Sequence, residues 1–272
     1  MLGLYEKALP FSLDWDTKLG AVKELGFDFM ELSIDPAHMD RLDWTESGIA
    51  ELRDASLRTG LPIYTIALSA NREFPMGSKD EGTREKGKSV LKKAIRLARK
   101  LGVRIVQVAT YDVFDEESDA ETDRLYLDGL RECERVAALA GVMLALETMD
   151  TPYADSIGRC KRILDIIGSP WIQIYADIGN IAAMGLDFTK EIDHGASHVI
   201  AVHLKDTMPG VVRRIDYGTG IVDFDTDLKK LFQLDFRGFF VAEMWGDDIP
   251  DYMEKAAGAC RFLREKIAAA CV

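Results

Sequence analysis

Four side chains that can bind a metal ion stand at the ends of successive apolar segments in the second half of the chain. Glu147 ends "VMLALE", Asp177 ends "IQIYAD", His203 lies in "VIAVHL" and Glu243 lies in "FFVAEM". An ionised side chain in or beside an apolar run is unfavourable unless it is paired or bound to a cation. Any one of the four could be a capping or core residue, but their recurrence at four consecutive segments favours a shared role.

Three carboxylates that converge within a few ångströms cannot all stay ionised without a counter-charge. A divalent cation is the simplest species that supplies one. Oxygen donors with one imidazole suit Mn²⁺, Mg²⁺, Co²⁺ or Zn²⁺, and the ligand set alone does not choose among them. We therefore predict one divalent metal ion, with open positions for two neighbouring substrate oxygens, bound by Glu147, Asp177, His203 and Glu243.

These residues need a scaffold that brings strand ends together, and the hydrophobic pattern predicts one. Eight short runs rich in Val, Ile, Leu and Phe are typical of strands covered on both faces. They span residues 2–6, 29–34, 62–68, 104–110, 142–147, 172–177, 199–204 and 239–244. Helix-like segments separate them. Five of these segments stop at a glycine, which tolerates the left-handed conformation that ends a helix: Gly26, Gly60, Gly102, Gly141 and Gly168.

The number and length of the units favour a closed barrel. Eight strand–helix units in 272 residues average roughly 34 residues each, the size of a βαβ repeat. An open doubly wound sheet would need a glycine-rich phosphate turn after the first strand, where the sequence has "YEKALP". We predict an α/β fold with a single (β/α)₈ TIM-barrel domain, residues 1–272, whose chemistry lies at the C-terminal ends of the strands.

Composition excludes several classes of protein. The chain is 47% hydrophobic and 29% charged, with a net charge of −12. Without a Lys/Arg-rich stripe, that charge argues against a nucleic-acid partner. No apolar run reaches membrane-spanning length, and the first residues look like strand and loop rather than a secretion leader. The four cysteines lack CxxC spacing and are interpreted as reduced thiols. We expect a cytoplasmic protein with neither nucleic-acid nor membrane partners.

Longer sequence motifs restrict the range of functions that the chain could have. The segments "GLYEKALP", "LSANREFPMGS", "LETMD", "YADIGN", "AVHLKDTMPG", "GTGIVDF" and "AEMW" occur in that order. With them the chain resembles the L-ribulose-5-phosphate (L-xylulose-5-phosphate) 3-epimerases, within the larger group of xylose-isomerase-like barrels. The resemblance runs from about Leu2 to the last helix. It implies the same four metal ligands, a role in pentose phosphate metabolism and, as in many relatives, a homodimer.

The resemblance also implies the reaction. The ketose lies across the metal, one glutamate removes the proton at C3, and the other returns a proton to the opposite face of the enediolate. Glu147 and Glu243 are the expected pair. Inverting a carbon needs a base and an acid on opposite sides, and the fifth and eighth strands can face each other across the barrel mouth. A bound cation stabilises the developing oxyanion.

The substrate's phosphate needs a positive charge, and three cations that follow barrel strands could supply it: Lys7, Arg72 and Lys205. Each could also be a solvated surface cation, and Arg213 and Arg214 are weaker candidates. The "GTG" segment at 218–220 could offer N–H groups to a phosphate or only shape a turn. Further contacts to the sugar are expected from Asn71, where relatives often carry a histidine, from Asn180, and from Trp245, which could equally pack under a helix.

Alternative activities are weighed against the same residues. Epimerases of free ketoses carry a histidine where this chain has Asn180 and an arginine soon after the histidine ligand, where it has "LKDTMPG". A phosphorylated substrate is therefore favoured. A hexulose-6-phosphate isomerase stays open, because an enediolate can also be reprotonated at C1. Abasic-site endonucleases need several zinc ions and many histidines, and this chain has four. A non-enzymatic sugar-binding barrel would not need two opposed glutamates.

Overall fold

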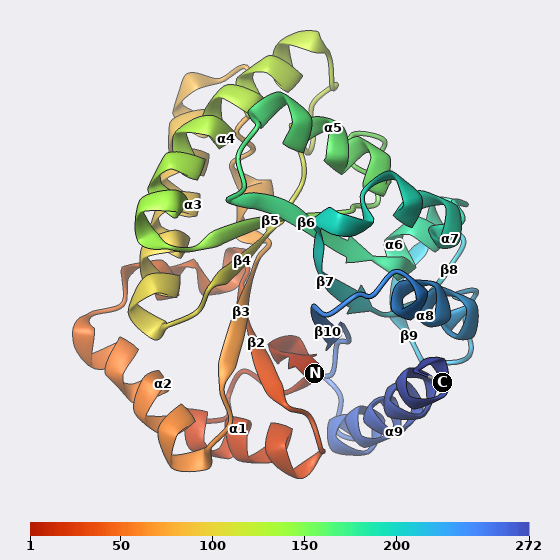
Figure 1. Ribbon diagram of the computed structural model, residues 1–272. Coiled ribbons are helices and arrows are strands. Elements are labelled where there is room, and N and C mark those ends of the chain that lie inside the picture. Colours follow the sequence, from red (N-terminus) through yellow and green to blue (C-terminus); the bar gives the residue numbers. More distant parts are fainter. Residues whose placement is uncertain (272) are drawn as a thin grey trace.

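The computed structural model describes residues 1–271 and contains a closed barrel of eight parallel strands (Figure 1). The strands are β1 (Leu2–Tyr5), β2 (Phe29–Ile34), β3 (Ile63–Leu68), β4 (Ile105–Ala109), β5 (Met143–Glu147), β6 (Ile172–Asp177), β7 (Val199–Leu204) and β10 (Phe239–Ala242). They follow one another around the barrel in chain order, and β10 pairs with β1 to close it. The predicted barrel is confirmed, and the predicted strand bounds agree to within two residues.

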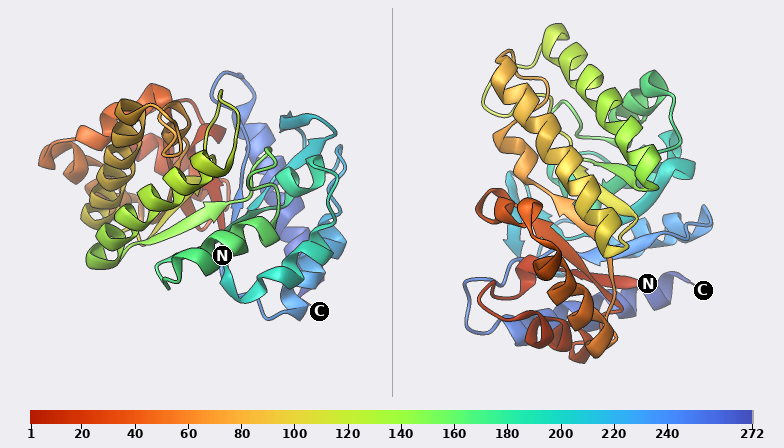
Figure 2. Two further views of the ribbon diagram at one scale, coloured as in Figure 1. Left: turned by 90° about the horizontal axis from the view of Figure 1, so that it is seen from above. Right: turned by 90° about the vertical axis from the view of Figure 1, so that its left-hand side faces the viewer.

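Helices surround the barrel on its outside, and α3 and α4 pack side by side there (Figure 2). The α-helices are α1 (Trp15–Glu24), α2 (Glu46–Thr59), α3 (Glu81–Leu101), α4 (Ala120–Ala140), α5 (Ile157–Ile167), α6 (Ile178–Ala183), α7 (Phe188–Glu191), α8 (Phe224–Gln233) and α9 (Tyr252–Ala270). Short 3₁₀ turns are η1 (Glu6–Ala8), η2 (Pro36–Asp43), η3 (Ala70–Glu73), η4 (Ile192–His194) and η5 (Ala196–His198). Glycines end the helices as predicted: Gly102 caps α3 with a φ of 79° and Gly141 caps α4 with a φ of 66°.

Aromatic rings close the N-terminal end of the barrel. Phe29, Tyr64 and Phe239 stand near the starts of their strands, with ring centroids 5.2 to 5.4 Å apart. Gly3 on β1 leaves room for them, because a Cβ there would lie 2.4 Å from the Phe29 ring. A second apolar layer joins the outer faces of the strands to the helices. The open end of the barrel is therefore the C-terminal one, where the predicted metal ligands stand.

A short antiparallel hairpin interrupts the alternation of strands and helices after β7. It consists of β8 (Asp206–Met208) and β9 (Val211–Ile215), and Gly210 has a φ of 73° in its turn. Val212 and Arg213 of β9 line the cavity at the barrel mouth. The hairpin is an element additional to the eight strand–helix units predicted from the sequence.

Two predictions from composition can be compared with the fold. Within residues 1–271, no helix combines the length and the hydrophobicity needed to cross a membrane. The cysteines are free thiols, as predicted: Cys133, Cys160 and Cys260 are buried and Cys271 is exposed.

Candidate metal and active site

The four predicted ligands meet at the C-terminal mouth of the barrel. Glu147 and Asp177 are the last residues of β5 and β6, His203 precedes the last residue of β7, and Glu243 directly follows β10. One ligand atom from each lies within 4.8 Å of all the others. Because Asp177 pairs with His203 in the strand register, these two side chains start at the same level of the barrel. The barrel thus brings together donors from four consecutive strands.

The donor atoms fit a divalent cation. Nδ1 of His203 lies 2.7 Å from Oε1 of Glu147 and 4.0 Å from Oε2 of Glu243, so this nitrogen faces the cluster. Metal–ligand distances of about 2.0–2.6 Å place opposite ligands roughly 4–5 Å apart, which matches the spread of the four donors. Three carboxylates with one imidazole also form a donor set that Mn²⁺, Mg²⁺, Co²⁺ and Zn²⁺ accept.

Lys205 contributes a positive charge to the same cluster. Its Nζ lies 2.6 Å from Oδ2 of Asp177 and 2.7 Å from Oε2 of Glu243. The side chain is 6% exposed, so both ion pairs are shielded from water. The ammonium group therefore bridges two of the predicted metal ligands.

Burial and mutual charges shift the pKa values of the groups in this cluster. Burial, with the charges of Glu243 and Glu147, raises the pKa of Asp177 to about 7 against the opposing charge of Lys205. Burial alone would raise the pKa of Glu243, but the charges of Lys205 and His203 lower it to about 2. Burial would lower the pKa of His203, yet the charges of Glu31 and Glu243 raise it well above its ordinary value. Without a metal, protons on Asp177 and His203 offset the excess negative charge.

Asp177 is also the N-cap residue of α6. Its Oδ1 accepts the N–H of Asn180 at 3.0 Å and so caps the start of α6, which ends the strand at the ligand. The Asn180 side chain donates to the carbonyl of Thr148 at 2.9 Å and lines the mouth cavity. Asn71 donates to the carbonyl of Ala109 at 2.7 Å. Its buried Oδ1 has no hydrogen-bond partner among the described residues.

The remaining predicted cations lie around the same mouth. Lys7 pairs with Asp35. The Arg72 guanidinium lies 5.6 Å from the ring centre of Tyr111, and its buried Nε has no hydrogen-bond partner within residues 1–271. Arg213, predicted as a weaker candidate, faces the mouth cavity.

Arg213 and Arg214 are neighbours on the hairpin, but their side chains point in different directions. The Arg213 guanidinium lies 5.7 Å from the Trp245 ring, and Trp245 also packs edge-on against Tyr5 with a centroid distance of 6.3 Å. Arg214, with a φ of 61°, turns away and pairs with Asp248 at 2.6 Å. Arg213 is thus directed to the mouth cavity, whereas Arg214 attaches the hairpin to the loop after β10.

The glycines at 218–220 do not present N–H groups to a ligand. The N–H groups of Gly218 and Gly220 both donate to Oδ2 of Asp206 at 2.8 Å. A Cβ at Gly220 would lie 2.2 Å from the same carboxylate, so the close approach requires glycine. The prediction that this segment offers N–H groups to a phosphate is wrong, because Asp206 already occupies them; the alternative, a turn-shaping role, is confirmed.

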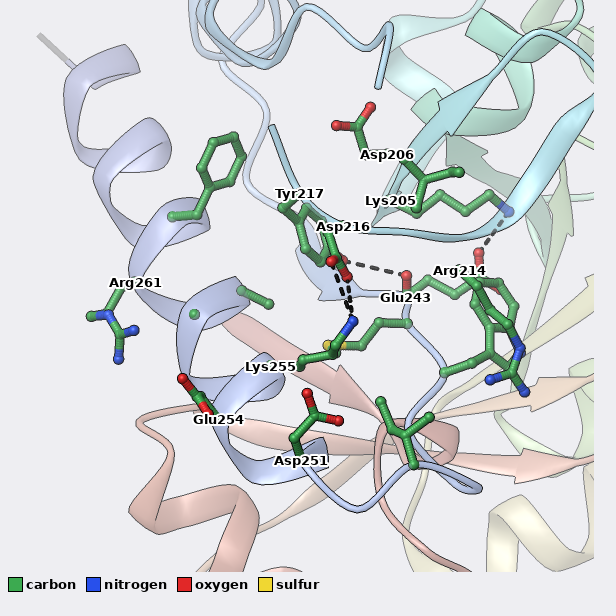
Figure 3. Close-up of a pocket in the computed structure, with 17 residues that line it drawn as sticks. Lys205, Asp206, Arg214, Asp216, Tyr217, Glu243, Asp251, Glu254, Lys255 and Arg261 are labelled. Carbon is green, nitrogen blue, oxygen red and sulfur yellow. Dashed lines mark hydrogen bonds and ion pairs between the residues drawn. The ribbon is translucent and has the colours of Figure 1, made fainter. Parts of the chain in front are cut away.

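Two cavities meet at Glu243. The mouth cavity has a volume of about 90 Å³ and is lined by Glu147, His203 and Glu243 together with Lys7, Arg72 and Arg213. The neighbouring cavity, about 690 Å³, lies between α9 and the segment that follows β9, where Lys255 is directed toward Asp216 (Figure 3). Of the four predicted ligands, only Glu243 lines this larger space. The smaller cavity is therefore the one that adjoins the predicted metal ligands.

Comparisons with known proteins show the family of the chain. The family model described as "Xylose isomerase-like TIM barrel" matches residues 19–266. L-ribulose-5-phosphate 3-epimerase UlaE of Shigella flexneri is 39% identical over 271 residues, which cover 99% of this chain and 95% of that protein. The protein of the same name from Escherichia coli strain SMS-3-5 matches with the same identity and coverage. The chain belongs to this epimerase family. It is accordingly an enzyme of the isomerase class.

Solved structures agree on the fold of this epimerase. An L-ribulose 3-epimerase superposes with a TM-score of 0.82 at 21% identity, covering 99% of this chain and 95% of the other. D-psicose 3-epimerase of Clostridium cellulolyticum H10 superposes with a TM-score of 0.82 at 17% identity, covering 98% and 99%.

Sequence reasoning missed two residues behind the ligands. The side-chain amide of Gln107 on β4 donates to Oε2 of Glu147, while its own oxygen accepts the N–H of Leu68 at 2.9 Å. Glu31 on β2 lies 2.7 Å from Nε2 of His203. Both could have been found as polar residues inside apolar runs, "RIVQVAT" and "FMELSI", because a buried polar side chain needs a partner.

Proposed function

We propose that this epimerase interconverts L-ribulose 5-phosphate and L-xylulose 5-phosphate in a metal-dependent reaction that uses Glu147 and Glu243 as proton carriers. The observation that carries the proposal is the convergence of these two glutamates on one metal-binding cluster. They come from β5 and β10, which are separated in the barrel by β6 and β7. Relatives at 39% identity that are named L-ribulose-5-phosphate 3-epimerase support the substrate.

Glu147, Asp177, His203 and Glu243 would hold the cation. A bound divalent ion supplies Lewis-acid stabilisation of the negative charge that develops when a proton leaves the carbon next to a carbonyl. The chain's own residues set up the proton transfers. Gln107 fixes one carboxylate oxygen of Glu147, and Lys205 fixes one carboxylate oxygen of Glu243.

Two proton carriers approach the sugar from different strands, as inversion requires. For one epimer Glu147 takes the proton from C3 and Glu243 returns a proton to the opposite face; for the other epimer the roles exchange. The cluster is nearly closed to water, because Glu147 is 4% exposed and His203 is 1% exposed. Exclusion of water strengthens the electrostatic stabilisation and protects the enediolate from side reactions.

The phosphate group would extend from the cluster toward Arg72 and Arg213. Both guanidinium groups line the mouth cavity, and the Nε of Arg72 has no protein partner among the described residues. Arginine is suited to bidentate recognition of phosphate. Lys7 lines the same cavity but already pairs with Asp35. Lys205 is assigned instead to the carboxylates it contacts.

The remaining predicted contacts fall to the sugar. Trp245 walls the cavity beside Arg213, and Asn180 lines it next to the metal cluster. Asn71 lies on η3 next to Arg72, with a free buried oxygen that could accept a hydrogen bond from a sugar hydroxyl.

Deuterium exchange tests the reaction. Metal-loaded protein would be incubated with L-ribulose 5-phosphate in D₂O, and the C3 and C1 proton signals followed by NMR. Loss of the C3 signal with formation of L-xylulose 5-phosphate is the expected result. Exchange at C1 with an aldose product would assign the protein as an isomerase instead, and exchange at neither carbon would remove the proposed substrate.

A further inference from the structure

The imidazole of His203 is held between two carboxylates on opposite edges of its ring. Nδ1 lies 2.7 Å from Oε1 of Glu147, on the side of the metal cluster. Nε2 lies 2.7 Å from Oε1 of Glu31, on the other side. Glu31 comes from β2, which is separated from β7 by β1 and β10. The contact therefore crosses the interior of the barrel and does not follow from strand pairing.

Glu31 is itself fixed by donors from two other strands. Its Oε2 accepts hydrogen bonds from the hydroxyl of Thr65 at 2.7 Å and from the hydroxyl of Tyr175 at 2.8 Å. The Tyr175 ring also packs against the imidazole of His203, with ring centroids 4.4 Å apart. A carboxylate can only accept, so both hydroxyl protons point at Glu31 and leave its Oε1 to the imidazole.

The complete burial of the Glu31 carboxylate needs a physical explanation. It is 0% exposed, and within residues 1–271 its only ion-pairing partner is His203. A buried carboxylate is costly to keep unless its interactions compensate for lost hydration. Glu147, Asp177 and Glu243 converge on a metal-binding cluster, whereas Glu31 lies outside it.

From this geometry we propose that Glu31 is a positioning residue for the metal site, which holds the proton of His203 on Nε2 and leaves the Nδ1 lone pair for the metal ion. Which ring nitrogen of a histidine binds a metal is set by the hydrogen bond that the other nitrogen makes. The inference rests on the metal site of the proposed function but not on the substrate or the reaction.

Metal affinity gives the first test. Zn²⁺ affinity would be measured by competition with a chromophoric chelator for the wild type, Glu31→Gln and Glu31→Leu. Loss of an outer partner typically weakens metal binding by about 10–100-fold. The Leu substitution removes the acceptor and should show this full loss. The Gln substitution keeps an oxygen that accepts from Nε2–H, so its affinity should fall between the two.

A matched control separates positioning from general stability. Asp112 is also a buried carboxylate, 1% exposed, and accepts hydrogen bonds from Ser118 and Thr122 outside the metal cluster. Asp112→Asn should lower the melting temperature of the metal-free protein while leaving Zn²⁺ affinity unchanged. If both Glu31 variants bind Zn²⁺ within about twofold of the wild type, the proposal is overturned.

Nitrogen-15 NMR of the imidazoles provides a readout that a merely structural role would not move. The chain has four histidines, so the spectrum of protein labelled in the histidine rings is simple, and His203→Gln identifies the relevant signals. In the Zn²⁺-loaded wild type we expect a protonated Nε2 and a metal-bound Nδ1. A protonated Nδ1 would overturn the proposal. This spectrum and the Zn²⁺ affinity of the Gln variant test the role of Glu31 even if the Leu variant does not fold.

These measurements need no substrate, so the two proposals fail separately. A wild type that binds Zn²⁺ through Nδ1 but does not exchange the C3 proton would refute the epimerase and keep the role of Glu31. An active enzyme whose Zn²⁺ affinity is unchanged by both substitutions would keep the epimerase and refute the role of Glu31. A wild type that takes up no Zn²⁺ would overturn the role of Glu31.

Discussion

Nζ of Lys205 lies 2.7 Å from Oε2 of Glu243. The same nitrogen contacts Asp177, and we therefore propose that Lys205 acts on these carboxylates rather than on the phosphate. We expect Lys205→Met to lower kcat by on the order of 10²-fold, because a misplaced catalytic group costs about that much. The loss should be similar for the phosphorylated ketose and the free sugar in steady-state assays. A raised KM for the phosphorylated substrate alone would return Lys205 to the phosphate.

Replacing either proton carrier should remove turnover. Glu147→Gln and Glu243→Gln each replace a carboxylate that would bind metal and carry a proton, and general acid–base catalysis contributes about 10²–10⁴-fold. The measurement is the rate of epimerisation in both directions. Glu254→Gln is the control, because Glu254 lines only the neighbouring cavity. A near wild-type rate in either active-site variant would rule out the two-glutamate mechanism.

The metal-free protein should lose stability as the pH rises. The folded pKa of Asp177, about 7, and that of His203 both lie above the values of an unfolded chain. Groups with raised folded pKa values stabilise the fold at low pH, and this contribution is lost as the pH rises through the folded values. We therefore expect the melting temperature to fall between about pH 5 and pH 8.

Bound Zn²⁺ should counteract the fall in melting temperature at higher pH, because the metal replaces the protons on its ligands. The increase in melting temperature on adding Zn²⁺ should thus grow with pH over the same interval. The Glu243 carboxylate, with a pKa of about 2, stays ionised throughout. Asp177→Asn cannot titrate, so the metal-free variant should show a flatter profile. If the melting temperature of the metal-free wild type rises with pH, the raised pKa values assigned to Asp177 and His203 are wrong.

The phosphate end can be tested with three arginines. Arg72→Ala and Arg213→Ala should each raise KM for the phosphorylated substrate by about 10–100-fold, because a hydrogen bond to a charged group contributes about 1.5–3 kcal/mol. Arg261→Ala is the control, since Arg261 lines the neighbouring cavity and not the mouth cavity. Steady-state kinetics with phosphorylated and free ketose distinguish the outcomes. Equal effects on both sugars would exclude phosphate binding by that arginine.

Asp206 should matter for stability more than for chemistry. Its carboxylate accepts the N–H groups of Thr207, Gly218, Gly220 and Val222. Asp206→Ala leaves these donors without their acceptor and should destabilise the fold by about 1–3 kcal/mol or more in urea unfolding. Unchanged stability would show that water replaces the carboxylate in this turn.

The barrel could be predicted because its signals are local. Strand bounds follow from apolar runs, and helix ends follow from glycines such as Gly102, so the residues at strand ends could be named directly. Contacts across the barrel are different. The Glu31–His203 pair depends on side-chain direction inside the barrel, and the position of Lys205 depends on which carboxylates it reaches. The hairpin was missed because β8 is short, β9 is largely exposed, and neither has the apolar run of a barrel strand.

The attachment of the hairpin has a consequence for how this architecture can diversify. In the proposed mechanism the proton carriers stand at the ends of barrel strands, whereas Arg213 comes from an insertion that is joined to the neighbouring loop through Arg214 and Asp248. Exchange of residues 208–215, which keeps Asp206 and the turn that it holds, would leave every proposed metal-binding position in place while altering the charge that lines the mouth cavity. Under the proposed function, substrate range and reaction type would therefore be encoded in separable parts of the chain, so that evolution or an engineer could change the first without rebuilding the second.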